Sequence, residues 1–163
     1  MYSRRQFGEM MLAGLPLSLV LRHINSKFKG VQIGAITYSF RSMPATEIIP
    51  AMVKLGLSEA ELMSNHCEAL AGVPQGAGFG GPRGQVTPEQ QEARRRQQEA
   101  LSKWRMSTSP DIFKAVKKKF NDAGIDVPIL CFNQRMTATD DEIEYAFQMA
   151  RALGVKRSHR VRR

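Results

Sequence analysis

Four polar residues stand near the ends of three apolar runs. Tyr38 lies near the end of residues 31–40, Glu61 and His66 lie at the end of residues 57–64, and Asn133 follows residues 125–132. Their side chains can donate and accept hydrogen bonds, and the carboxylate and the imidazole can also move protons. Because an unpaired carboxylate is costly to bury in an apolar strand, we expect Glu61 to have a functional or an ion-pairing role.

Three of these residues also have a purely structural interpretation. Tyr38 can be a core aromatic residue with its hydroxyl at the surface, and His66 can be a solvated loop residue. Asn133 can stabilise a turn through its side-chain amide. The elements around them decide between the two interpretations.

The apolar runs alternate with helical patterns. Residues 31–40, 57–64 and 125–132 have the composition of buried strands. Thr46 can cap a helix that has Pro50 in its first turn and Gly56 at its end. Ser109 and Pro110 can begin the next helix, which Gly124 ends. This alternation predicts an α/β fold with parallel strands.

The third helix has the clearest signals. Thr139 and Glu142 have the spacing of a capping box, and Gly154 follows the helix. Its predicted buried stripe consists of Ile143, Ala146, Phe147, Ala150 and Leu153.

Residues 71–108 look like an insertion between the second strand and the next regular helix. They contain a Gly/Pro-rich loop and a polar helical run over about residues 88–105. Residues 76–81 match G-x-G-x-x-G, but Pro74 precedes them and Pro82 follows. A dinucleotide site needs a strand directly before the glycines and a helix directly after them, so we reject that match.

The net charge of +9 lies at the two ends of the 163-residue chain. Residues 1–29 and residues 156–163 each contain five Lys and Arg, whereas residues 30–155 contain 14 basic and 14 acidic residues. A nucleic-acid site needs a basic surface on the folded body, so we expect no nucleic-acid partner.

The N-terminus resembles a twin-arginine export signal. Arg4 and Arg5 precede the apolar residues 10–21, in the order of a signal peptide. The resemblance predicts that residues 1–29 engage the twin-arginine (Tat) export machinery and that the protein is periplasmic or otherwise extracytoplasmic. A soluble amphipathic helix is the alternative.

Residues 156–163 have no periodicity that could bury a face, so we expect a basic tail. The preceding pattern leads toward another strand, and we expect the natural domain to continue, with this chain a truncated or frame-shifted product. A flexible tail is the alternative. For Cys67 and Cys131, 64 residues apart, we expect two free thiols rather than a disulfide.

Three segments carry a resemblance to a known family: Gly30–Arg41, Gly56–His66 and Ile129–Asn133. Over about residues 30–155 the chain resembles the sugar phosphate isomerase/epimerase family, which are xylose isomerase-like (β/α)8 TIM barrels. A complete barrel needs about 250 residues. We therefore expect the N-terminal portion of such a barrel, about three βα units with parallel strands.

The resemblance implies metal-assisted isomerisation or epimerisation of a sugar or sugar phosphate. The divalent metal (Mn²⁺, Mg²⁺ or Co²⁺) of the full-length parent is held mainly by later strands. We therefore assign no metal ligand or catalytic residue and expect no cofactor for this chain. Tyr38, Glu61, His66 and Asn133 would contact sugar hydroxyls.

An isolated half-barrel has open sheet edges, so we expect this chain to be inactive alone and to self-associate through those edges. Two alternatives remain open. One is a non-catalytic carbohydrate-binding protein, and the other is a small self-sufficient doubly wound α/β domain.

Overall fold

The computed structural model describes residues 24–74, 87–134 and 138–162. The elements follow the order β1 (Lys27–Phe28), β2 (Val31–Gln32), β3 (Ala35–Ile36), η2 (Thr37–Phe40), α2 (Ala45–Lys54), β4 (Glu59–Met63), α3 (Ser64–Leu70), α4 (Pro88–Ser107), α5 (Ile112–Asp122), β5 (Asp126–Gln134), α6 (Asp140–Leu153) and β6 (Arg157–Arg162). Within this part of the chain, no helix is long and apolar enough to cross a membrane. Most of the predicted export segment and the G-x-G-x-x-G residues 76–81 lie outside the described residues.

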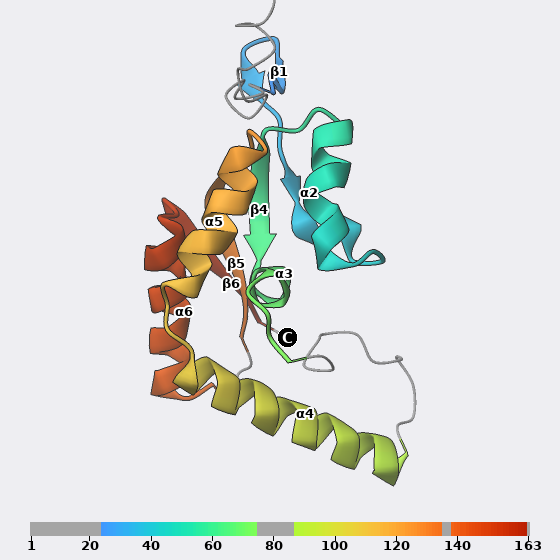
Figure 1. Ribbon diagram of the computed structural model, residues 1–163, viewed down its shortest axis with the longest axis vertical. Coiled ribbons are helices and arrows are strands. Elements are labelled where there is room, and N and C mark those ends of the chain that lie inside the picture. The colour runs from blue at the N-terminus through green and yellow to red at the C-terminus, as the bar shows by residue number, and fades with distance from the viewer. Residues whose placement is uncertain (1–23, 75–86, 135–137, 163) are drawn as a thin grey trace, which may run out of the picture.

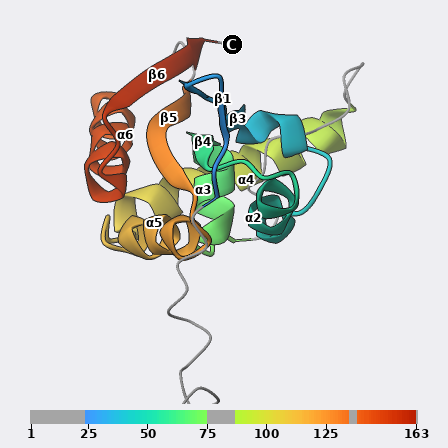
Figure 2. The same cartoon turned by 90° about the horizontal axis from the view of Figure 1, so that it is seen from above.

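The main sheet contains four parallel strands in the order β3-β4-β5-β6 (Figure 1). The prediction of an α/β chain with parallel strands is therefore confirmed. The four strands do not close into a barrel. Helices α2, α5 and α6 lie on the outer side of the curved sheet (Figure 2).

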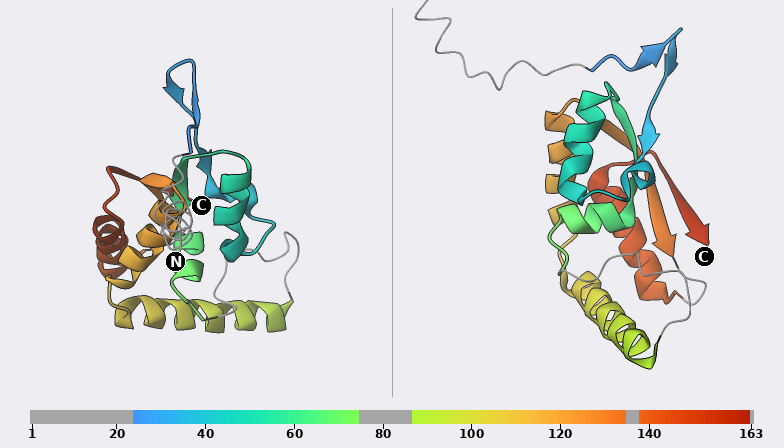
Figure 3. Two further views of the ribbon diagram at one scale, coloured as in Figure 1. Left: turned by 45° about the horizontal axis from the view of Figure 1, so that its top comes forward. Right: turned by 90° about the vertical axis from the view of Figure 1, so that its right-hand side faces the viewer.

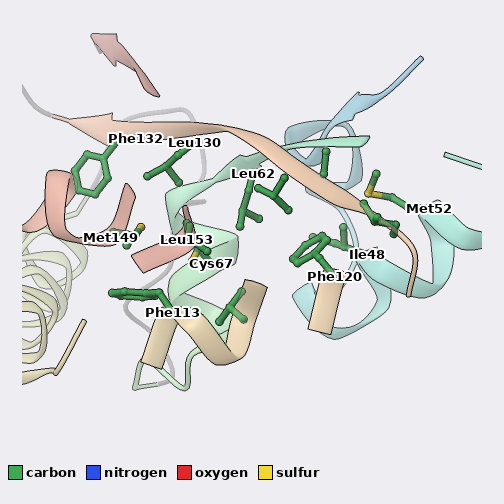
Figure 4. Packing of buried hydrophobic residues seen from close by; sticks show 14 of the residues in the cluster. Ile48, Met52, Leu62, Cys67, Phe113, Phe120, Leu130, Phe132, Met149 and Leu153 are labelled. Atoms are coloured by element: carbon green, nitrogen blue, oxygen red, sulfur yellow. The ribbon is translucent and has the colours of Figure 1, made fainter. Parts of the chain in front are cut away.

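Apolar residues on that side form the core (Figure 4). Alternate residues of a strand face opposite sides of the sheet. Leu62 of β4 and its register partner Leu130 of β5 are both fully buried in the core. The helices complete it with Ile48, Met52, Phe113, Val116, Phe120, Met149 and Leu153.

The prediction of one strand over residues 31–40 is wrong. Lys29 and Gly30 both have positive φ values, 48° and 82°, as a two-residue hairpin turn requires. Residues 31–32 therefore pair with β1 in an antiparallel hairpin instead of joining the parallel sheet. Only Ala35–Ile36 pair with β4, and Tyr38 lies in the 3-10 helix η2.

The prediction of an irregular basic tail over residues 156–163 is also wrong in its structure. The backbone of Arg157–Arg162 forms β6, which pairs in parallel with β5 from Ile129 to Gln134. The strand that the preceding helix leads toward is therefore present, as the fourth strand of the sheet.

Two predicted helix starts are displaced by a few residues. Pro44, not Thr46, is the N-cap of α2, so Pro50 lies inside that helix rather than in its first turn. Asp111 is the N-cap of α5, because Ser109 belongs to the turn before it and its hydroxyl accepts a hydrogen bond from the Asp111 N–H at 3.3 Å.

The predicted start of helix α6 is confirmed, but its buried face differs from the predicted one. Its capping box is present, since Thr139 Oγ1 accepts from the Glu142 N–H and Glu142 Oε2 accepts from the Thr139 N–H, both at 3.3 Å. The buried residues are Tyr145, Met149 and Leu153, whereas Phe147 is 51% exposed. Tyr145 packs edge-on against Phe113 of α5, which turns the helix away from the predicted stripe.

Candidate functional site

Polar residues gather at the carboxyl edge of the parallel sheet. Thr37 follows β3, residues 64–66 follow β4 directly as the first turn of α3, and Asn133 lies near the end of β5. Carboxyl ends of parallel strands meet at one edge, where ligand sites of α/β folds are built. We call Thr37, Ser64, Asn65, His66 and Asn133 the carboxyl-edge cluster.

Thr37 connects β3 to the end of β4. Its fully buried Oγ1 accepts a hydrogen bond from the Met63 N–H at 2.9 Å and lies 3.0 Å from His66 Nδ1. Burial lowers the pKa of His66 from its ordinary value of 6.5. The ring is therefore neutral at pH 7, and Nε2 is its remaining atom for a hydrogen bond.

Asn133 connects β5 to the first turn of α3. Its N–H donates to Ser64 Oγ and its Nδ2 donates to Asn65 Oδ1, both at 3.1 Å. Its Oδ1 atom is buried and accepts no hydrogen bond among the described residues. Such a buried acceptor costs about 1–3 kcal/mol until a donor reaches it.

The four predicted site residues have different positions. His66 and Asn133 both belong to the carboxyl-edge cluster and are 7% and 6% exposed, so His66 is a buried helix residue rather than a solvated loop residue. Tyr38 directly follows Thr37 and is half-buried beneath the Arg41 guanidinium, 4.8 Å from its ring centroid. Glu61 lies inside β4, between Ile36 and Ile129 in register, and not at its end.

Sequence reasoning missed a buried ionic network beside this cluster. Arg105 donates through Nε and Nη2 to the two carboxylate oxygens of Glu68, at 2.7 and 3.1 Å. Tyr145 donates its hydroxyl to Glu68 Oε1 at 3.1 Å. The guanidinium also lies 5.4 Å from the Phe132 ring centroid and 5.5 Å from that of Tyr145.

The network fixes α3, and with it residues 64–66, to α4 and α6. Burial opposes the charge on Arg105, but the hydrogen bond and charge of Glu68 outweigh it and raise the Arg105 pKa. Burial and then the Glu68 carboxylate raise the pKa of Tyr145 far above its usual range, so it stays a hydrogen-bond donor. The sequence signal for this network is slight: Arg105 next to Trp104 at the end of an otherwise solvated helix.

The described residues do not fit a divalent metal. No three His, Cys, Asp or Glu side chains among them lie close enough together to hold one. Nδ1 of His66 is already engaged with Thr37. Cys67 and Cys131 are both buried, and the two thiols form no disulfide with each other, as predicted. Burial, followed by the Glu68 charge, raises the pKa of Cys67.

A cavity of about 630 Å³ lies at the opposite, amino edge, beneath the β1–β2 hairpin. Its lining includes Ser26, Gln32 and Ser58, which bond to one another: the two hydroxyl oxygens are 2.7 Å apart, and Gln32 Nε2 lies 2.9 Å from Ser58 Oγ. Ser26 also donates to the Ile33 carbonyl at 2.7 Å. The hydrogen bonds of these groups are satisfied within the protein, so we assign this polar network a structural role that connects the hairpin to the sheet.

A scan against protein-family models gives no match, and searches of curated proteins and of solved structures give none either. The resemblance seen in the sequence accordingly stays a prediction. The functional interpretation therefore depends on the geometry of the carboxyl edge.

Proposed function

We propose that the chain is a sugar phosphate isomerase/epimerase-like protein and that its carboxyl-edge cluster binds the hydroxyl groups of a sugar. The observation that carries the proposal is the buried Asn133 Oδ1 atom, which has no donor among the described residues. A sugar hydroxyl is a donor of the required kind, and it can accept a hydrogen bond in return.

The chemistry of the cluster favours a neutral polyol. Thr37, Ser64, Asn65 and Asn133 are uncharged, and the lowered pKa of His66 keeps its imidazole neutral at pH 7. A phosphate group is usually held by cations or bidentate arginines. The buried Arg105 donates through Nε and Nη2 to Glu68, so its charge is already paired with a carboxylate. We therefore expect a free sugar to bind more tightly than its phosphate.

The role of these residues is to bind and orient. Asn133 Oδ1 would accept a hydrogen bond from one hydroxyl, and His66 Nε2 would form a hydrogen bond with a second. The hydrogen bonds of Asn133 to Ser64 and Asn65, and of His66 to Thr37, keep the two side chains in fixed positions. The parent reaction, proton transfer next to a carbonyl, needs a divalent metal whose ligands the described residues do not provide. We accordingly expect no turnover by this chain alone.

A non-catalytic carbohydrate-binding protein is the second candidate. The uncharged cluster supports it equally, because binding polyol hydroxyls needs no metal and no ionised group. The two candidates differ in the response of a chain completed to a whole barrel, where added Mn²⁺, Mg²⁺ or Co²⁺ would activate an isomerase and leave a binding protein unchanged.

The test is calorimetric titration of the purified chain with D-xylose, with a xylose phosphate and with a diol of similar size. We expect measurable binding of the sugar, weaker binding of its phosphate and none of the diol. Asn133→Leu should lose binding by at least about tenfold, which is the loss of one good hydrogen bond. Gln32→Leu at the amino edge is the matched control. No binding of any sugar, or equal loss in both variants, would contradict the proposal.

We also propose periplasmic export through Arg4 and Arg5. Replacement of both by lysine preserves the charge of the segment. It should leave the protein in the cytoplasm of a Tat-competent bacterium, as measured by fractionation, whereas continued export would contradict a twin-arginine signal.

A further inference from the structure

The β1–β2 hairpin projects beyond the amino edge of the sheet (Figure 3). In its antiparallel register, Phe28 lies directly opposite Val31, and Lys27 lies directly opposite Gln32. Directly opposed residues share one face of a hairpin. Gln32 Nε2 bonds to Ser58 Oγ at 2.9 Å, so the face of Gln32 is turned toward the sheet. The face that carries Phe28 and Val31 therefore points away from the body of the protein.

This outer face is apolar and uncovered. Phe28 is 67% exposed, Val31 is 63% exposed, and Ile33, which follows the hairpin, is 43% exposed. Half of the six exposed large apolar side chains in the described part of the chain thus fall within six consecutive residues. A projecting hairpin cannot fold over its own side chains, so these residues need another surface to be buried.

The turn adds a cation to the outer face. Lys29 Nζ lies 5.6 Å from the Phe28 ring centroid. The backbone of Lys29 has a φ of 48°, a left-handed conformation that glycine and asparagine adopt at lower cost than lysine. The geometry of the turn therefore does not account for a lysine at this position. What the lysine contributes is a positive charge beside exposed apolar side chains.

The charge of the hairpin is positive throughout. Residues 27–32 contain two lysines and no acidic residue. Glu59 and Asp126 line the cavity on the other side of the hairpin, and Asp126 is paired with Lys117 at 2.7 Å. Apolar side chains next to lysines are the combination that binds the interface of an anionic bilayer, where the side chains enter the headgroup region and the cations attract the lipids.

We propose that Phe28, Lys29 and Val31 dock the protein on the surface of an anionic lipid bilayer. The preceding sequence favours a bilayer over a protein partner, because residues 10–21 contain a single polar side chain, that of Ser18. Six residue steps separate residue 21 from residue 27, and they span at most about 22 Å. A membrane that receives the apolar segment would therefore lie within reach of the hairpin.

This docking would orient the sheet. The amino edge would face the bilayer, and the carboxyl-edge cluster, at the other end of the parallel strands, would stay open to solution. The docking face and the proposed sugar site are thus separate surfaces, and each can be tested without the other.

The first experiment measures flotation of the full chain with vesicles of phosphatidylcholine, either alone or mixed equally with phosphatidylglycerol. We expect binding to the anionic vesicles, and this binding should weaken as the salt concentration rises. Phe28→Ser should weaken it at least about tenfold, because it removes one large apolar side chain from the interface. Phe147→Ser on α6, at a phenylalanine that is 51% exposed, is the matched control and should leave binding unchanged. Circular dichroism verifies that both variants fold.

A second variant separates the charge from the fold. Lys29→Asn places a residue in the turn that suits a positive φ, so the free energy of unfolding should not decrease. Affinity for the anionic vesicles should fall about fivefold, which is the contribution of one lysine near a charged membrane surface. An unchanged affinity would contradict the role of this charge.

A fluorescence measurement locates the contact. With anionic vesicles, emission from the Phe28→Trp variant should shift to shorter wavelength and be quenched by brominated lipid. The unchanged chain, whose single tryptophan is Trp104 on α4, should show neither effect.

Four outcomes would overturn the proposal. Equal binding of Phe28→Ser and the unchanged chain would assign the binding to residues outside the hairpin. Equally tight binding to the two vesicle types would exclude recognition of anionic lipid. The other two are the absence of binding to either vesicle, and self-association without vesicles that Phe28→Ser abolishes, which would assign the outer face to a second copy of the chain.

Discussion

Polar side chains lie at both the amino edge and the carboxyl edge of the parallel sheet, but their hydrogen bonding differs between the two edges. At the amino edge, Ser26, Gln32 and Ser58 are mutual hydrogen-bond partners, and the Ser58 N–H also donates to Ser26 Oγ at 3.1 Å. At the carboxyl edge, Asn133 uses its N–H and its amide NH₂ but keeps a buried carbonyl oxygen without a donor among the described residues.

This difference in hydrogen bonding distinguishes a structural network at the amino edge from a candidate binding site at the carboxyl edge. A satisfied network stabilises the fold and gains little from a ligand, because each of its groups would have to give up a partner. A buried acceptor without a donor costs stability and regains it on binding. The comparison predicts that changes at the amino edge affect stability, whereas changes at the carboxyl edge affect binding.

The largest effect is expected where the carboxyl edge is supported. Arg105→Met leaves the Glu68 carboxylate buried without its cation, which should cost about 3–5 kcal/mol of unfolding free energy. Arg96→Met on the same helix breaks a pair whose arginine side chain is 73% exposed and should change stability by less than about 1 kcal/mol. Urea unfolding measures both, and similar losses in the two variants would contradict a structural role for the buried pair.

A smaller loss is expected at the amino edge. Ser58→Ala removes hydrogen bonds to Ser26 and Gln32 and should cost about 1–2 kcal/mol of unfolding free energy, without changing sugar affinity. Ser42→Ala, at an exposed serine, should be close to neutral. Unfolding curves and calorimetry on the same samples test the pair. Loss of sugar binding in Ser58→Ala would contradict a purely structural role for the amino edge.

Asn133→Leu should show the opposite behaviour. The substitution removes a buried acceptor that has no donor among the described residues, and it also removes the Nδ2 hydrogen bond to Asn65. Because these two effects oppose each other, stability should change by less than about 1 kcal/mol in either direction. Sugar binding should nevertheless be lost. Thermal unfolding with and without D-xylose measures both effects, and a loss of several kcal/mol without sugar would show that Asn133 serves the fold instead.

The smallest effect is a pH dependence at His66. Burial lowers its pKa below 6.5, so the unfolded chain binds this proton more readily than the folded chain. The stability that neutral His66 provides is therefore present above about pH 6.5 and falls as the pH is lowered through that value. His66→Gln should flatten this part of a plot of unfolding free energy against pH. An unchanged slope would assign it to another group.

Local signals in the sequence predicted the start of α6, whereas the predicted starts of α2 and α5 are displaced by a few residues. The capping box of Thr139 and Glu142 depends on residues three apart and is present as expected. The alternation of apolar runs and helical patterns predicted the parallel sheet. The run 31–40 was misassigned because its composition suits a strand throughout, whereas the turn at Lys29 and Gly30 diverts its first residues into a hairpin.

The site depends on contacts that no local pattern encodes. His66 meets Thr37 across 29 residues, Asn133 meets Ser64 across 69, and Glu68 meets Arg105 across 37. Two predicted residues belong to the cluster because His66 follows the end of β4 and Asn133 lies near the end of β5. The sequence does reveal the approximate ends of these strands. The Glu68 network could not be predicted, since it requires the orientation of a helix that looks solvated along most of its length.

The most direct test of the account is a ¹H–¹⁵N NMR titration of the labelled chain with D-xylose, following backbone and side-chain amide signals together. We predict that the Asn133 and Asn65 side-chain NH₂ signals shift with the backbone signals of Thr37, Ser64 and His66, while those of Ser26, Gln32 and Ser58 stay in place. Shifts confined to the amino edge, or no shift at any sugar concentration, would contradict a polyol site at the carboxyl edge.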